Sequence, residues 1–184
     1  MYDETRRAKT MHFDIKQTKS ILGRTPTLLN ALLIDAPPEL ITSNEGPDTW
    51  SPFDIVGHLI HGETTDWIPR TRIILKYGES RSFEPFDRFA QYEQSKDKSI
   101  SQLLEEFATL RRESLNALEE MKISVDQLSL RGTHPSLGSV TLRELLSTWV
   151  VHDLSHIAQA VRVMCRQYTD DVGPWKEFLP ILSH

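Results

Sequence analysis

Four long segments of this chain place apolar residues at the spacing of an amphipathic α-helix, and this pattern limits the fold more than any other feature. The segments cover residues 13–33, 51–77, 99–121 and 141–168. Signals for strands are poor, because no run alternates cleanly between turn dipeptides. At about 1.5 Å per residue each helix would be roughly 30–40 Å long. The sequence therefore predicts an all-α protein built as a four-helix bundle.

Capping residues predict where these helices begin and end. Three segments open with a hydroxyl residue followed three positions later by an acid or an amide, at Ser51/Asp54, Ser99/Gln102 and Thr141/Glu144. Gly78 is a suitable stop for the second helix. Pro26 interrupts the first segment, because proline lacks an amide donor and clashes with the preceding turn. We expect a break there, with Thr25 as a new cap.

The connections predict how the helices are arranged. The stretch between the second and third helices, residues 79–98, exceeds the roughly 2–8 residues that join most bundle helices. It is long enough to carry the chain back along the bundle, so that the third helix runs parallel to the second. Apolar residues after Tyr168 predict a short C-terminal helix that packs on the bundle or on a second copy in a homodimer. We expect residues 1–184 to form one domain.

Composition narrows the function classes. With 21 basic and 26 acidic residues the net charge is −5, so no overall field attracts nucleic acid or anionic lipid. No stretch approaches the roughly 18 apolar residues of a membrane span, and no apolar run follows residues 1–7 as in a signal peptide. The single cysteine excludes an internal disulfide. A cytoplasmic protein without a nucleic-acid or membrane partner is expected.

Two histidines on the fourth predicted helix are candidate metal ligands. His152 and His156 are four positions apart, and both lie within about 20° of Leu145 at about 100° per residue, in the middle of the apolar stripe. A buried imidazole nitrogen without a partner costs a few kcal/mol. A divalent metal ion held by both rings would remove that cost, although two satisfied core imidazoles remain an alternative.

A third ligand is needed, and the second helix offers His58 and His61. His58 lies at the edge of the apolar stripe, beside Ile55, whereas His61 is predicted to lie nearer the solvent. His58 is therefore the better candidate. Three histidines with an open position are typical of a reactive zinc-type site rather than a closed structural one.

Neighbouring polar residues have several interpretations. Gln159, one turn after His156, can orient a ligand or form a helix-interface hydrogen bond. Glu63 and Asp66 can act as a base or pair with Arg70. Asp153 points about 100° from His152 and is expected to be a cap or a surface charge. His134 precedes the fourth helix in a loop, where it can border the site entrance. Cys165 is expected to lie away from the histidines.

Several motifs together resemble the DinB/YfiT-like superfamily. Residues 50–59 (WSPFDIVGHL) resemble its second-helix motif, and residues 140–146 leading into 151–159 (VHDLSHIAQ) resemble its fourth-helix motif. Residues 24–33 and 132–138 are similar as well. The resemblance implies an up-down-down-up bundle. It also implies a metal ion, commonly zinc or nickel, held by His58, His152 and His156.

The same resemblance implies an enzyme with a small-molecule substrate, either a metal-dependent hydrolase or an S-transferase that uses a low-molecular-weight thiol. Fold and ligands alone do not choose between these reactions. The alternative is a non-catalytic bundle that dimerises or binds a small ligand around a buried histidine cluster. A weaker third hypothesis is an HD-type phosphohydrolase, because His152 and Asp153 form an adjacent His-Asp pair.

Overall fold

The computed structural model describes residues 12–183 and is almost entirely helical. Its four-helix bundle confirms the predicted fold class. The first rod comprises α1 (Ile15–Leu22) and α2 (Thr25–Leu33), and the second comprises α4 (Pro52–Thr65) and α5 (Trp67–Tyr77). The third and fourth rods are α7 (Ile100–Glu120) and α8 (Leu142–Arg166). Short elements join them: α3 (Pro38–Thr42), α6 (Ala90–Gln94) and the 3-10 helices η1 (Gly78–Ser80) and η2 (Asp126–Ser129).

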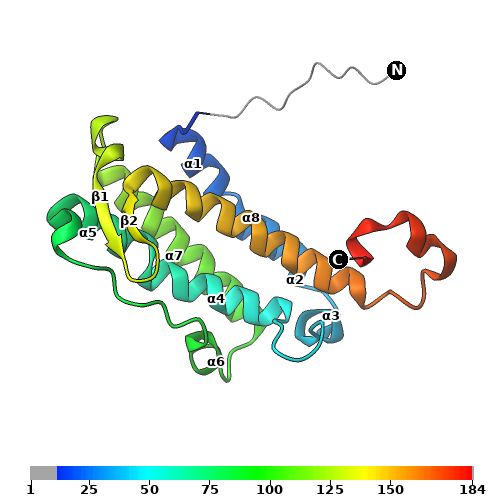
Figure 1. Ribbon diagram of the computed structural model, residues 1–184. Coiled ribbons are helices and arrows are strands. Elements are labelled where there is room, and N and C mark those ends of the chain that lie inside the picture. Colours follow the sequence, from blue (N-terminus) through cyan, green and yellow to red (C-terminus); the bar gives the residue numbers. More distant parts are fainter. Residues whose placement is uncertain (1–11, 184) are drawn as a thin grey trace, which may run out of the picture.

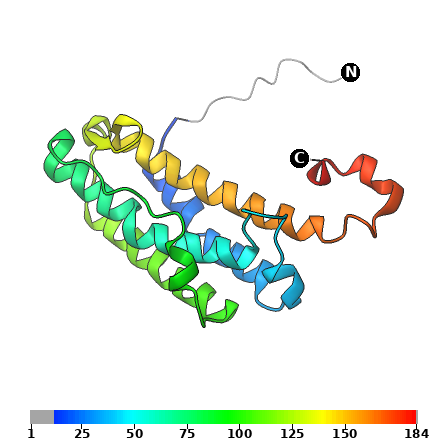
Figure 2. The ribbon, with the colours of Figure 1, turned by 60° about the horizontal axis from the view of Figure 1, so that its bottom comes forward.

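The direction of the rods follows the predicted up-down-down-up order. In Figure 1, α1 and α2 lead toward α3, α4 and α5 return, α7 repeats the direction of α4, and α8 reverses it. The long connection after α5 runs back along the bundle and carries α6 against α4, as Figure 2 also shows. The length of this connection thus explains why two consecutive rods are parallel.

Most predicted helix boundaries are confirmed. All three capping boxes form, at Ser51, Ser99 and Thr141. Gly78 ends α5 with a φ of 56°, a left-handed conformation that suits glycine. The first rod breaks before Pro26, but the predicted cap was wrong. Thr25 lies inside the first turn of α2 and donates its hydroxyl hydrogen to Asp153 instead.

A small hairpin was not foreseen. Strands β1 (Arg131–His134) and β2 (Gly138–Thr141) pair antiparallel, with Arg131 opposite Thr141. The hairpin packs against Phe83 of the long connection, whose backbone amide donates to Thr133. A Cβ on Gly132 would lie 2.7 Å from the Ile74 side chain, so only glycine permits this close approach. Four-residue strands are too short to give a clear alternating pattern in the sequence.

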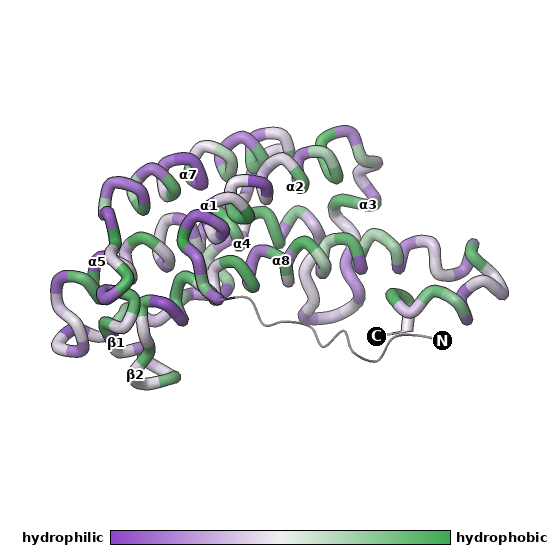
Figure 3. Tube along the Cα trace, turned by 90° about the horizontal axis from the view of Figure 1, so that it is seen from above, coloured by the Kyte–Doolittle hydropathy of each residue, from purple (hydrophilic) through white to green (hydrophobic). Residues whose placement is uncertain are grey.

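The apolar stripes face one another and form the core. One cluster of buried residues surrounds Trp67 and Trp149 near the hairpin, and a second surrounds Phe107 nearer α3. Figure 3 shows hydrophobic segments alternating with hydrophilic ones along α7 and α8, as expected for helices with one buried face.

A buried ion network joins the rods between these clusters. Arg111 of α7 is 1% exposed and uses all five of its N–H donors. Its Nη2 donates to Glu63 at 2.7 Å, its Nη1 donates to Asp153 at 2.5 Å, and the same Nη1 also donates to the carbonyl oxygen of Leu22. Trp149 donates to Glu63 as well. Two predictions were therefore wrong: Asp153 is buried rather than a surface charge, and Glu63 pairs with Arg111 rather than Arg70.

The C-terminal segment forms two short 3-10 helices, η3 (Gly173–Phe178) and η4 (Pro180–Leu182), beyond the end of α8 (Figure 1, red). The helix η4 returns to contact α8, whereas the side chains of Trp175 and Phe178 in η3 are more than two thirds exposed. Dimerisation through this segment stays a prediction. Among residues 12–183, no helix is both long and apolar enough to cross a membrane. The prediction about a signal peptide concerns residues 1–11, outside the described part of the chain.

Replacing Arg111 by methionine should lower the free energy of unfolding by about 3–5 kcal/mol, because two buried carboxylates lose their partner. Arg112 is the next residue of α7 and is exposed, so Arg112→Met is a matched control that should change stability by no more than about 0.5 kcal/mol. Denaturant unfolding measures both. Equal effects of the two substitutions would contradict the structural role of Arg111.

Candidate metal centre

Three imidazoles converge between α4 and α8. His58 comes from the second turn of α4, and His152 and His156 come from successive turns of α8. Each offers a ring nitrogen, and these three nitrogens lie within 4.8 Å of one another. The Nε2 atoms of His58 and His152 are 3.0 Å apart. The structure thus brings together the three residues that the sequence singled out.

Aromatic rings enclose this histidine cluster. The ring of Trp50 lies 4.6 Å from that of His58 and 5.9 Å from that of His156, between centroids. Phe86 contacts His58 edge-on, and Trp67 does the same to His152. The sequence did not mark Trp50 or Phe86 as site residues, although Trp50 immediately precedes the cap of α4.

The enclosure keeps the histidines neutral. Burial, reinforced by the nearby His156 and His152, lowers the pKa of His58 to about 3. Burial also lowers the pKa of His152 to about 3, with smaller contributions from His156 and Arg111. The pKa of His156 falls for the same reason, opposed by Gln159. Neutral imidazoles keep a lone pair, which a metal ion requires.

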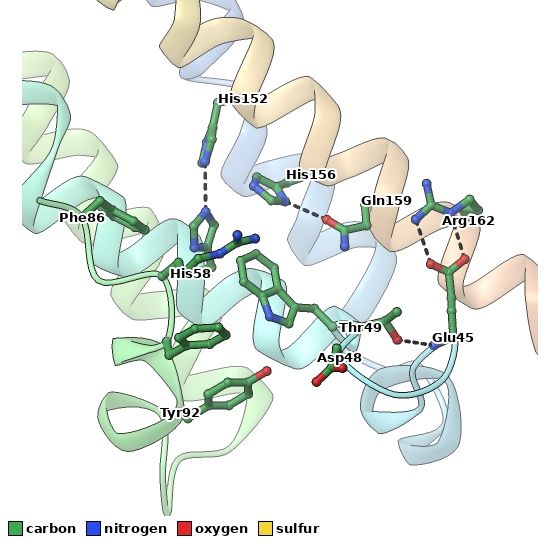
Figure 4. Close-up of a pocket in the computed structure, with 13 residues that line it drawn as sticks. Glu45, Asp48, Thr49, His58, Phe86, Tyr92, His152, His156, Gln159 and Arg162 are labelled. Carbon is green, nitrogen blue, oxygen red and sulfur yellow. Dashed lines mark hydrogen bonds and ion pairs between the residues drawn. The ribbon is translucent and has the colours of Figure 1, made fainter. Parts of the chain in front are cut away.

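Gln159 fixes one of the rings. Its side-chain oxygen lies 2.9 Å from Nδ1 of His156, and the dashed line in Figure 4 marks this contact. An amide oxygen accepts a hydrogen bond, so Nδ1 carries the proton and Nε2 carries the lone pair. This result favours the prediction that Gln159 orients a ligand. Hydrogen bonds of this kind set the tautomer of metal-binding histidines.

Hydrogen bonds do not satisfy all the ring nitrogens of the histidine cluster. Three neutral imidazoles present three lone pairs, and the one ring-to-ring contact can supply a donor to only one of them. The Nδ1 atoms of His58 and His152 are buried without a hydrogen-bond partner among the described residues. A positive ion at the centre would satisfy several nitrogens at once, so the donor set fits a divalent metal.

A cavity of about 830 Å³ opens on one side of the cluster. All three histidines line it, together with Trp50, Gln159 and a set of mostly polar residues: Glu45, Asp48, Thr49, Phe86, Arg88, Phe89, Tyr92 and Arg162. Glu45 holds Arg162 by two hydrogen bonds of 2.8 Å and also pairs with Arg166. We call this space the polar chamber. It gives molecules from the solvent a route to the histidine nitrogens.

A comparison with known protein families identifies the family of this chain. The family model described as the DinB superfamily matches residues 21–160. This chain belongs to the DinB superfamily. The matched region holds the three histidines, and the resemblance read from the α4 and α8 motifs is confirmed.

A solved structure of another four-helix bundle has a similar fold. The fold is similar to that of YfiT from Bacillus subtilis, with a TM-score of 0.71 over 91% of this chain and 93% of that one. The sequences are 19% identical, so this likeness shows the fold alone. YfiT is described as a "probable metal-dependent hydrolase with an unusual four-helix bundle topology". A comparison with curated proteins gives no match.

Within the DinB bundle, His61 and Asp153 differ from expectation. His61 is 6% exposed rather than on the surface, yet it lies against Phe86 and not in the cluster. Asp153 turns away from His152 toward Arg111 and Thr25. The adjacent His-Asp pair therefore cannot direct both side chains to one metal, which removes the main support for an HD-type site.

A second cavity, of about 290 Å³, lies on the other side of His58 and His152. It contains the ion pair of Asp66 and Arg70, 2.8 Å apart, as one alternative from the sequence predicted. Burial raises the pKa of Asp66 to about 6, and Arg70 opposes that rise. His134 borders this cavity from strand β1.

In metal-free protein, His156 should populate the Nδ1–H tautomer, because Gln159 accepts its proton. Long-range ¹H–¹⁵N spectra of the imidazole distinguish the two tautomers. Gln159→Leu keeps the size of the side chain but removes the acceptor, and the spectrum should then show an increased share of the Nε2–H form. The same tautomer in both proteins would show that Gln159 does not control the ring.

Proposed function

We propose that this protein is a metal-dependent enzyme in which His58, His152 and His156 hold one divalent ion, zinc or nickel. The observation that carries the proposal is the convergence of three neutral imidazoles in a polar chamber open to small molecules. Imidazole nitrogens suit both metals. Three protein ligands leave a coordination position free, which is the arrangement of catalytic rather than structural sites.

The bound ion would lower the pKa of a water molecule or thiol and polarise the bond under attack. Other residues of the chain orient the metal-binding histidines and surround them. Gln159 keeps the lone pair of His156 available, and the rings of Trp50 and Phe86 pack against His58 and hold it in place. Arg88 lines the chamber beside Trp50, where its charge can bind an anionic group of a small-molecule substrate.

Hydrolysis is the reaction that we propose first. The description of YfiT as a probable metal-dependent hydrolase supports it, as does the open route from solvent to the cluster. Water adds to an electrophilic carbon, the bond to the leaving group breaks, and the leaving group departs with the electron pair and takes up a proton. Asp66 is a candidate base outside the ligand set, since His58 and Asp66 line the same cavity and burial raises the pKa of Asp66 to about 6.

Transfer of a low-molecular-weight thiol is the second candidate, and the size of the chamber favours it. A volume of about 830 Å³ far exceeds what one water molecule needs, at about 30 Å³ in the liquid. The sole cysteine, Cys165, does not line the chamber, so the thiol would come from a cosubstrate. The sulfur of this cosubstrate loses a proton and forms a bond to the electrophile. The leaving group of the electrophile departs with the electrons of the bond that breaks.

Metal analysis of protein purified without an affinity tag should give about one divalent ion per chain. His152→Ala should lower this content at least tenfold, because two imidazoles form a much weaker site. His61→Ala is the matched control: it removes a buried histidine from α4 outside the cluster and should retain the metal. Full metal content in His152→Ala would refute the ligand assignment.

Any turnover found in a panel of esters and thiol acceptors should be lost with a chelator and restored by the metal. His58→Ala should lower kcat/KM by at least a hundredfold while the fold, measured by circular dichroism, is kept. The non-catalytic alternative predicts the opposite: full stability in chelator and no rise in Tm when metal is added. Turnover unaffected by both chelator and His58→Ala would exclude the proposed site.

A further inference from the structure

The second cavity shares residues with the polar chamber. His58, His152 and Phe86 line both spaces, so the histidine cluster lies between them and can be reached from two sides. The surface that lines the second cavity is mostly apolar, although Asp66, Arg70, His134, Glu144 and Thr148 also border it. Five apolar side chains from four different parts of the chain contribute to this surface: Trp67, Phe83, Leu137, Val140 and Leu145. We call this cavity the apolar chamber.

One wall of the apolar chamber is built by parts of the fold that lie outside the four rods. Phe83 and Phe86 come from the long connection, and Leu137 and Val140 come from the hairpin. Gly132 allows the hairpin to sit directly on Phe83, where a Cβ would come within 3.0 Å of the ring. The hairpin and the connection thus form a lining opposite α5 and α8.

The size and character of the apolar chamber suit a small hydrophobic group. Its volume of about 290 Å³ exceeds that of an apolar cavity of roughly 150 Å³, which can hold a benzene molecule. The buried ion pair in its wall has partners within the protein, since Asp66 pairs with Arg70 and Arg70 also donates to the carbonyl oxygen of Glu84. An aliphatic or aromatic group that enters this chamber buries its apolar surface against the apolar side chains of the lining.

We infer that the apolar chamber is a second substrate compartment, which binds the aliphatic or aromatic part of a reactant and holds it against His58 and His152. The polar chamber then receives the charged reactant or the leaving group from the opposite side. This inference rests on the proposed function for its chemistry, but the compartment itself can be tested without turnover.

Benzene is the probe, and ligand-observed NMR of the full chain measures its binding. Val140→Trp and Thr148→Trp would fill the chamber from the hairpin and from α8, and each should weaken benzene binding at least tenfold. Leu130→Trp is the control, because Leu130 is partly exposed just before the hairpin and lines neither chamber. Two filling variants on separate elements keep the test valid when one does not fold.

The position next to the cluster is tested with cobalt. Benzene protons should relax at least fivefold faster with Co²⁺-loaded protein than with Zn²⁺-loaded protein, and both filling variants should abolish the difference. Benzene binding that neither tryptophan weakens, or equal relaxation with the two metals, would overturn the inference. Failure of the protein to take up either metal would refute the proposed function instead, while benzene binding sensitive to both variants would still support the compartment.

Discussion

The guanidinium group of Arg111 lies between a carboxylate of α4 and a carboxylate of α8, the two helices that carry the histidines. Glu63 follows His58 by five positions, and Asp153 follows His152 directly. A rotation of either helix that would separate the imidazoles would also break hydrogen bonds inside a dry interior, where an unpaired charge is costly. The same arginine binds the end of α1 through Leu22, so one side chain connects the three rods around it to the geometry of the site.

The fold was largely predictable because its signals are local. Ser51, Ser99 and Thr141 cap helices through contacts within three residues, and the apolar stripes repeat over several turns. The histidine cluster was predictable for a related reason: the spacing of His152 and His156 fixes their common direction on one helix. The choice of His58 over His61 rested on the apolar stripe of α4 and on the resemblance to the superfamily motif. Both side chains are in fact buried, so exposure does not separate them.

The remainder depends on partners far away in the sequence. Asp153 was expected on the surface because its direction on α8 differs from that of the histidines, but that direction leads to Arg111, 42 positions earlier. Thr25 has the local signature of a cap, yet a buried acceptor on another helix competes for its hydroxyl. Both errors have one physical cause. The partners of a buried polar group come from several helices, and the periodicity within one helix does not reveal them.

The connections between the four rods bear on the proposed function. Four rods are sufficient to bring three imidazoles together, but the residues that would select a substrate lie mostly between the rods. Phe86, Arg88 and Tyr92 come from the long connection, and Leu137 comes from the hairpin. The rods are constrained by packing and by the Arg111 network, whereas loops can change length and side chains without loss of the core. The bundle shared with YfiT at 19% identity shows the fold alone. Under the proposed function, the lining of the two chambers would decide which molecules reach the histidine cluster.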